Sequence, residues 1–212
     1  MKDLAARAIS QPLVTHIYTA DPSAHVFEGK LYVYCSHDIE GGVAFNDDGA
    51  HFCMEDYHVL SMDSPDGPAT DCGLALHVSE VPWAERQMWA PDAACRDGRY
   101  YLYFPAKTAE GLFRIGVAVG EHPAGPFTPQ PRPIDGTYSI DPSVFADDGG
   151  EHYLLFGGIW GGQLQKYRDN AYDAGNEEPR DGEPALGPRI ARLRADMLEL
   201  DEPTREVQIL DE

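Results

Sequence analysis

Three aspartates, Asp21, Asp92 and Asp141, stand at equivalent places in three repeats of one sequence pattern. In each repeat a tyrosine-containing segment follows the aspartate, as in ADPSAHVFEGKLYVYCSHD, WAPDAACRDGRYYLYFPA and IDPSVFADDGGEHYLLFGG. Stacked or radial all-β architectures carry equivalent positions of successive repeats to a common centre. Carboxyl groups that converge there could act as general acids and bases.

Asp21 and Asp141 share the local sequence Asp-Pro-Ser. Because a residue before proline favours extended backbone, the motif predicts that both aspartates are extended at the start of a turn. The shared motif also indicates one local geometry used twice. It fits a catalytic carboxylate, and it fits an Asx turn in which the side chain accepts backbone N–H groups, so both interpretations stay open.

Aromatic residues near these aspartates could bind a sugar. Trp89 lies just before Asp92 in WAPD, and an indole face can cover the apolar surface of a sugar while a carboxylate binds its hydroxyls. Burial between sheets is the stronger interpretation for Trp89 taken alone. Trp160 has four glycines around it in GGIWGGQ, which would let the backbone turn tightly and bring the ring into a cleft. His25 is close enough to Asp21 in sequence to share its site.

Composition and motifs exclude several classes of function. The 36 acidic and 16 basic residues give a net charge of -20, which repels phosphates, so we expect no nucleic-acid or membrane partner and favour a neutral substrate. The sequence has no GxSxG motif, no phosphate-binding glycine loop and no CxxC pair among its 4 cysteines, which leaves paired carboxylates as the catalytic constellation. The segment MKDLAARAIS lacks the apolar run of a secretory signal, so a cytoplasmic location is expected.

Short β-strands must position these groups, and helical periodicity is scarce. The aspartates are 71 and 49 residues apart, and a four-stranded propeller blade takes about 40 to 50 residues. Runs of aromatic and β-branched residues predict strands separated by Gly, Pro and Asp turns. These predicted strands cover residues 30–35, 57–62, 99–104, 113–119 and 152–156.

We therefore predict one domain over residues 1–212, with blades that start near residues 21, 92 and 141. The polar segment after Gln165, rich in Gly and Pro, is typical of a long exposed loop. Residues 189–200 have helix-forming composition, but their context favours paired strands of a partial further blade after residue 188. Three blades and part of a fourth do not close a ring, so the sequence predicts an incomplete domain with unpaired strand edges.

The same segments resemble family 43 of the glycoside hydrolases, which are five-bladed β-propellers that act on xylose- and arabinose-containing glycans. The resemblance extends from His16 to Asp211 and includes QMWAPDAACRDGRYYLYFPAK, FRIGVAVGEHPAGPF and YSIDPSVFADDGGEHYLLFGGIWGGQLQ. Phrases such as SHD and GGIWGG are most similar to β-xylosidase-like members. The resemblance implies an all-β, five-bladed propeller of which this chain supplies about three to four blades.

Carried onto this sequence, the resemblance implies a role for each candidate. Asp21 would be the general base that activates water, and Asp141 would be the third carboxylate, which orients the acid and modulates its pKa. Trp89, Asp92 and Trp160 would line the sugar pocket. The family inverts the anomeric centre, which fits two carboxyl groups held roughly 6.5 to 9.5 Å apart so that a water fits beneath the sugar.

The family's general acid is a glutamate near the start of the fourth-blade repeat, and no glutamate of this chain sits in a comparable motif. We therefore leave the acid unassigned and expect this chain to lack it. Loss of such a group typically slows hydrolysis about a hundred- to ten-thousandfold. No cofactor is expected to be required, although the resemblance allows a structural calcium ion near a histidine, with ligands that the sequence does not identify.

The leading hypothesis is the N-terminal part of an inverting glycosidase, with xylo- or arabino-oligosaccharides as substrates. The alternative is a carbohydrate-binding propeller that retains the aromatic pocket without hydrolysis. A third hypothesis is a domain completed by another chain or by a second copy of this one, because the last blade would expose a strand edge.

Overall fold

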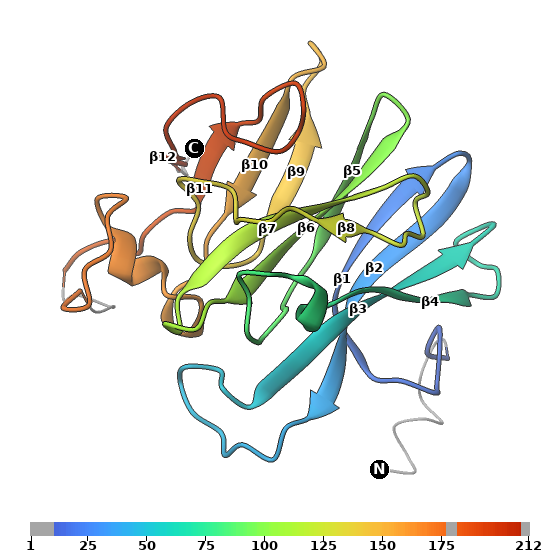
Figure 1. Cartoon of the computed structure of the whole chain (residues 1–212), viewed down its shortest axis with the longest axis horizontal. Coiled ribbons are helices and arrows are strands. Elements are labelled where there is room, and N and C mark those ends of the chain that lie inside the picture. The colour runs from blue at the N-terminus through green and yellow to red at the C-terminus, as the bar shows by residue number, and fades with distance from the viewer. Residues whose placement is uncertain (1–10, 177–181, 209–212) are drawn as a thin grey trace.

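The computed structural model describes residues 11–176 and 182–208, which form β-strands, loops and three short 3-10 helices. The strands make three four-stranded antiparallel sheets that follow one another along the chain (Figure 1). Within the described ranges, no helix has the length and apolar character needed to cross a membrane. The prediction of an all-β chain is confirmed.

The first sheet contains four strands paired in chain order, namely β1 (Thr19–Phe27), β2 (Lys30–Glu40), β3 (Phe52–Met62) and β4 (Thr70–His77). A tight hairpin joins β1 to β2, with Glu28 and Gly29 at φ angles of 53° and 76°. Two successive positive φ angles are what a two-residue type I′ turn needs. Between Ala20 and Ser23 a bulge interrupts the pairing of β1 with β2, at the position of Asp21.

The second sheet lies between the other two and is also paired in chain order. Its strands are β5 (Asp92–Arg96), β6 (Arg99–Lys107), β7 (Phe113–Gly120) and β8 (Thr128–Pro129). The linker from the first sheet begins with the 3-10 helix η1 (Val78–Glu80). Alternate side chains of β6 point to opposite faces, so Leu102 and Phe104 enter the core shared with the first sheet while Tyr101 and Tyr103 enter the core shared with the third.

The third sheet has the order β12-β11-β10-β9, with β9 (Ser143–Ala146), β10 (His152–Phe156), β11 (Arg189–Arg192) and β12 (Arg205–Glu206). The prediction that a further blade begins after residue 188 is wrong, because β11 pairs with β10 through Phe156 and Arg189 and β12 pairs with β11. The connection from β10 to β11 contains the 3-10 helices η2 (Trp160–Gly162) and η3 (Leu164–Tyr167). Because this connection is long, local sequence patterns do not reveal that β11 pairs with β10.

Two hydrophobic cores fill the spaces between successive sheets. The core between the first and second sheets includes Tyr57, Leu76, Met88 and Phe104, and the core between the second and third includes Tyr103, Ile115, Leu154 and Phe156. Four-stranded sheets packed face to face around a centre are successive blades of a β-propeller. The predicted fold class is therefore confirmed, with three blades in the described residues.

Candidate active site

Asp21 and Asp141 adopt the same backbone conformation in two different parts of the fold. Their φ angles are 51° and 56°, in the left-handed region that non-glycine residues rarely occupy. The predicted extended backbone is therefore wrong at both aspartates, because tertiary contacts outweigh the preference set by the following proline. One such contact is the 2.8 Å hydrogen bond from the N–H of Gly157 to the carbonyl of Ile140. Strain of this kind costs about 1–3 kcal/mol and concentrates at functional sites.

Asp21 lies close enough to Asp141 to affect the ionisation of Asp141. Burial raises the pKa of Asp141 to about 6, and the negative charge of Asp21 contributes to this rise. The pKa of Asp21 is itself raised, first by burial and then by the charge of Asp38. Both aspartates nevertheless remain exposed to solvent, so a substrate can reach them. Neighbouring carboxyl groups with raised pKa values are suited to acid–base chemistry.

A small apolar cluster packs against the backbone next to both aspartates. It contains Met54, Trp89 and Phe113, and the residues that precede the aspartates, Ala20 and Ile140, contact it. The indole of Trp89 is 8% exposed, and its N–H donates a 3.0 Å hydrogen bond to a backbone carbonyl of β3. The family resemblance implies that Trp89 lines the sugar pocket, but the structure buries it in this cluster, as the WAPD pattern taken alone favours.

Asp92 is a buried link between the three sheets. Its Oδ1 accepts hydrogen bonds of 2.5 Å from the hydroxyl of Ser23 and 2.6 Å from Nε2 of His25, both on β1. Its Oδ2 accepts a 2.6 Å bond from the backbone N–H of Val144 on β9. Burial acts to raise the pKa of Asp92, but these hydrogen bonds outweigh it and hold the pKa below its ordinary value. Asp92 and His25, predicted as sugar contacts, are thus bonded to each other across two blades.

The glycine-rich segment 157–163 lies against the Asp141 turn. The hydroxyl of Ser139 accepts a 2.9 Å hydrogen bond from the N–H of Gly158. A Cβ atom on Gly158 would come within 2.8 Å of the isoleucine side chain that precedes Asp141 and 3.5 Å of Oδ2 of Asp141, so the close approach requires glycine. Trp160 lies on this segment and is 57% exposed, so its ring is accessible to a ligand.

Three residues near the aspartates were not predicted. Asp38 acts on the pKa of Asp21, and Ser139 ties the Asp141 turn to the glycine-rich segment. The ammonium of Lys107 is buried 4.8 Å from the centroid of the Phe113 ring. Asp38 ends the SHD phrase, but no local pattern marks the other two, since their neighbours come from distant parts of the chain.

The structural calcium ion that the resemblance allows is not matched by any group of three or more His, Cys, Asp or Glu side chains in the described part of the chain. There, one group of His, Cys, Asp or Glu side chains is compact enough to share a metal ion, and it consists of His37, Asp56 and His58. Calcium takes about six to eight oxygen ligands, whereas this group offers two imidazole nitrogens. The group does not fit calcium, and no catalytic step is assigned to a metal ion.

Comparisons with known proteins agree on one family. The model of Glycosyl hydrolases family 43 matches residues 19–179. Xylosidase/arabinosidase 43A of Humicola insolens is 58% identical over 207 residues, which cover 94% of this chain and 63% of the relative. The GH43_1 enzyme from Xanthomonas citri, solved in complex with xylotriose, is 64% identical with a TM-score of 0.92, over 100% of this chain and 62% of that one.

A third relative is CoXyl43, a GH43 β-xylosidase/α-arabinofuranosidase from a compost microbial metagenome, solved with xylotriose in a calcium-free form. It is 59% identical with a TM-score of 0.90, over 93% of this chain and 61% of that one. This chain therefore spans less than two thirds of the length of the relatives it matches. The region matched by the family model contains both Asp-Pro-Ser motifs, Asp92 and the glycine-rich segment.

Proposed function

The chain belongs to glycosyl hydrolase family 43. We propose that the protein is an inverting glycosidase that hydrolyses xylose- and arabinose-containing glycans, and that β-xylosides are its preferred substrates. One observation carries the proposal: Asp21 and Asp141, from matching motifs of the first and third sheets, lie close enough that the charge of one helps to raise the pKa of the other. The relatives support the substrate class, since one is named a xylosidase/arabinosidase and two were solved with xylotriose.

In this proposal Asp21 is the general base. It takes a proton from a water molecule that attacks the anomeric carbon on the face opposite the leaving group. Asp141 holds negative charge beside the reaction centre, which favours the protonated form of a neighbouring carboxylic acid and helps to orient it. The general acid that protonates the leaving oxygen stays unassigned.

The sugar contact proposed for this part of the site is Trp160, because its ring is exposed on a segment that touches the Asp141 turn. An indole face packs well against the C–H face of a pentose. Trp89, Asp92 and His25 are proposed as positioning residues, since their polar groups are bonded within the protein. The cytoplasmic location remains a prediction. Association with a second copy of this chain or with a complementing chain also remains a prediction.

The test is hydrolysis of para-nitrophenyl β-D-xyloside and α-L-arabinofuranoside by the full-length protein and its Asp21→Asn variant. We expect a fall in kcat of about a hundred- to ten-thousandfold when the base is lost. Asp97→Asn is the matched control, because Asp97 also has a positive φ, 52°, but lies in the exposed turn between β5 and β6. Its activity should stay within about twofold of the wild type.

Proton NMR of the first sugar released tests the stereochemistry. Inversion of a β-xyloside yields α-xylose before mutarotation. If β-xylose appears first, the inverting mechanism is wrong. If Asp21→Asn hydrolyses the substrates as well as the wild type does, Asp21 is not the base. Saturable xylotriose binding by a folded protein that hydrolyses neither substrate would favour the carbohydrate-binding alternative.

A further inference from the structure

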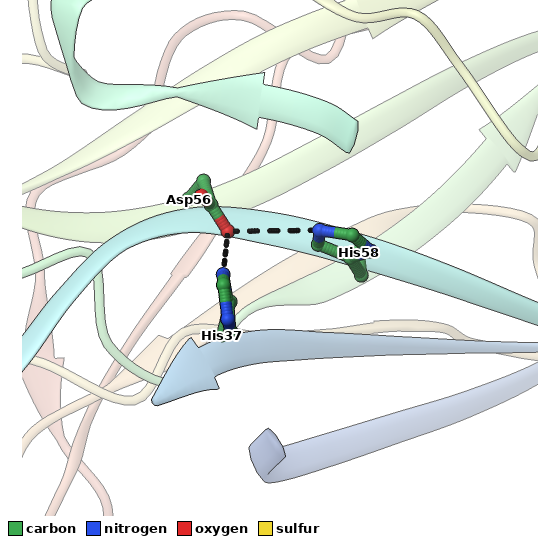
Figure 2. A group of neighbouring side chains, drawn as sticks. All are labelled: His37, Asp56 and His58. Atoms are coloured by element: carbon green, nitrogen blue, oxygen red, sulfur yellow. Dashed lines mark hydrogen bonds and ion pairs between the residues drawn. The ribbon is translucent and has the colours of Figure 1, made fainter. Parts of the chain in front are cut away.

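Two histidines and an aspartate meet on the first sheet, on strands β2 and β3 (Figure 2). Nδ1 of His37 lies 3.0 Å from Oδ1 of Asp56, and Nε2 of His58 lies 4.0 Å from the same oxygen. One possible ligand atom from each of these three residues lies within 4.8 Å of the other two. Nothing in the proposed hydrolysis uses these three side chains.

Strand geometry explains why they converge. Asp56 and His58 are two residues apart on β3, so their side chains share one face of the sheet. Tyr57 between them points the other way, into the core, where its hydroxyl donates a 2.7 Å bond to the carbonyl of Trp89. His37 lies at the irregularity in pairing between β2 and β3, and a bulge of this kind re-aims a side chain.

A second carboxylate fixes the orientation of His58. Nδ1 of His58 lies 3.0 Å from Oδ1 of Asp71 on β4. Asp71 is itself held by Nε2 of His16 at 2.7 Å and by the backbone N–H of Gly73 at 2.8 Å. With Nδ1 of His58 bonded to Asp71, the other ring nitrogen, Nε2, is directed toward Asp56. A carboxylate behind the far nitrogen of a histidine is the usual support of a metal ligand.

We propose that His37, Asp56 and His58 bind one first-row divalent transition-metal ion, with Zn²⁺ as the best fit. Two imidazole nitrogens and one carboxylate oxygen are ligands that Zn²⁺ prefers, and water can complete the tetrahedron. Ca²⁺ and Mg²⁺ favour oxygen ligands and should bind poorly. The ion replaces the hydrogen bond between His37 and Asp56 and joins β2 to β3.

Access to this site is open. The side chains of His37, Asp56 and His58 are 24%, 18% and 16% exposed, so an ion can enter without unfolding of the sheet. A metal ion bound here would hold the end of β2 that leads to Asp38, which acts on the general base.

Isothermal titration of the full-length, untagged, metal-stripped protein with ZnCl₂ tests the proposal. We expect saturable binding of one Zn²⁺ per chain, and no such binding of Ca²⁺ or Mg²⁺. His37→Gln and His58→Gln should each weaken Zn²⁺ binding more than about a hundredfold, and Asp71→Asn about ten- to a hundredfold. His122→Gln, in an exposed loop of the second sheet, should leave the affinity unchanged.

Two outcomes overturn the proposal: no saturable Zn²⁺ binding by the wild type, or binding that both His37→Gln and His58→Gln retain at full affinity. Circular dichroism checks that each variant is folded. Should the variants fail to fold, zinc X-ray absorption of the wild-type protein decides. Two imidazole nitrogens in the coordination shell support the site, and a shell with fewer than two contradicts it.

Discussion

Nε2 of His25 and Oδ1 of Asp92 lie 2.6 Å apart and join the innermost strands of the first two sheets. The same aspartate accepts the backbone N–H of Val144 from the third sheet. One buried carboxylate therefore ties together the strands that begin beside both proposed catalytic aspartates. Asp92 therefore links β1, which contains Asp21, to β9, which begins two residues after Asp141.

Replacement of Asp92 by alanine should destabilise the protein by about 3–5 kcal/mol, because one buried and two partly buried donors lose their acceptor. Denaturant unfolding measures the change. Asp63→Ala is the control, since the Asp63 side chain is 91% exposed in a surface ion pair, and it should change the free energy of unfolding by less than about 0.5 kcal/mol. Equal effects of the two substitutions would show that Asp92 is no structural link.

The stabilisation by Asp92 should also depend on pH. Its pKa in the folded protein is below the ordinary value of 3.8, so the folded state favours the charged form. The stabilisation is then fully present above the unfolded-state pKa and is lost as pH falls through the folded-state pKa. Unfolding curves from pH 7 to pH 2 should show the difference between wild type and Asp92→Ala shrinking below about pH 4. A difference that grows on acidification would contradict the assignment.

Asp141→Asn should abolish most activity and yet stabilise the fold at neutral pH. Because the pKa of Asp141 is raised from 3.8 to about 6, the folded state favours the protonated form and its stability declines as pH rises between those values. The amide removes this decline, and asparagine also tolerates a positive φ. Because Asp141 is exposed, solvent screening should reduce this effect to about 1 kcal/mol. Thermal melts should therefore show a midpoint a few degrees higher at pH 7 and no gain at pH 3.

Gly158→Ala should disturb the Asp141 turn. The new Cβ would lie 2.8 Å from the side chain of Ile140, an overlap that typically destabilises a protein by about 1–3 kcal/mol and here also displaces a proposed catalytic residue. The double variant with Ile140→Ala should recover part of the lost activity. A double-mutant cycle of unfolding free energies and rates measures the coupling between the two residues. Additive effects would contradict the close contact between them in the structure.

Trp160→Ala should weaken substrate binding with little effect on stability, because the ring is 57% exposed. Loss of one aromatic sugar contact worth about 1 kcal/mol would raise KM several-fold while kcat changes less. Trp89→Ala is the informative contrast, since loss of a buried indole should lower the free energy of unfolding by about 3–5 kcal/mol. A large stability loss in Trp160→Ala would indicate a structural ring.

The sequence alone predicted the all-β architecture, the five strand segments and the three aspartates, because alternating aromatic residues, turn residues and repeated motifs act over a few neighbouring positions. It also singled out Trp160 from its glycines. Residue patterns favoured burial of Trp89, whereas the family resemblance placed both Trp89 and Trp160 in the sugar pocket. The sequence could not assign β11 to the third sheet.

Only the tertiary structure decided the roles of the aspartates. Asp92 meets donors 69 and 52 residues away in the sequence, and no local pattern marks such partners. The left-handed backbone at Asp21 and Asp141 accompanies the bulge between β1 and β2 and the hydrogen bond from Gly157 to Ile140, and these contacts override the preference of a residue before proline. Burial and the field of distant charges set ionisation, and both are properties of the assembled fold, so the sequence determined which carboxylates exist and the fold determined what each can do.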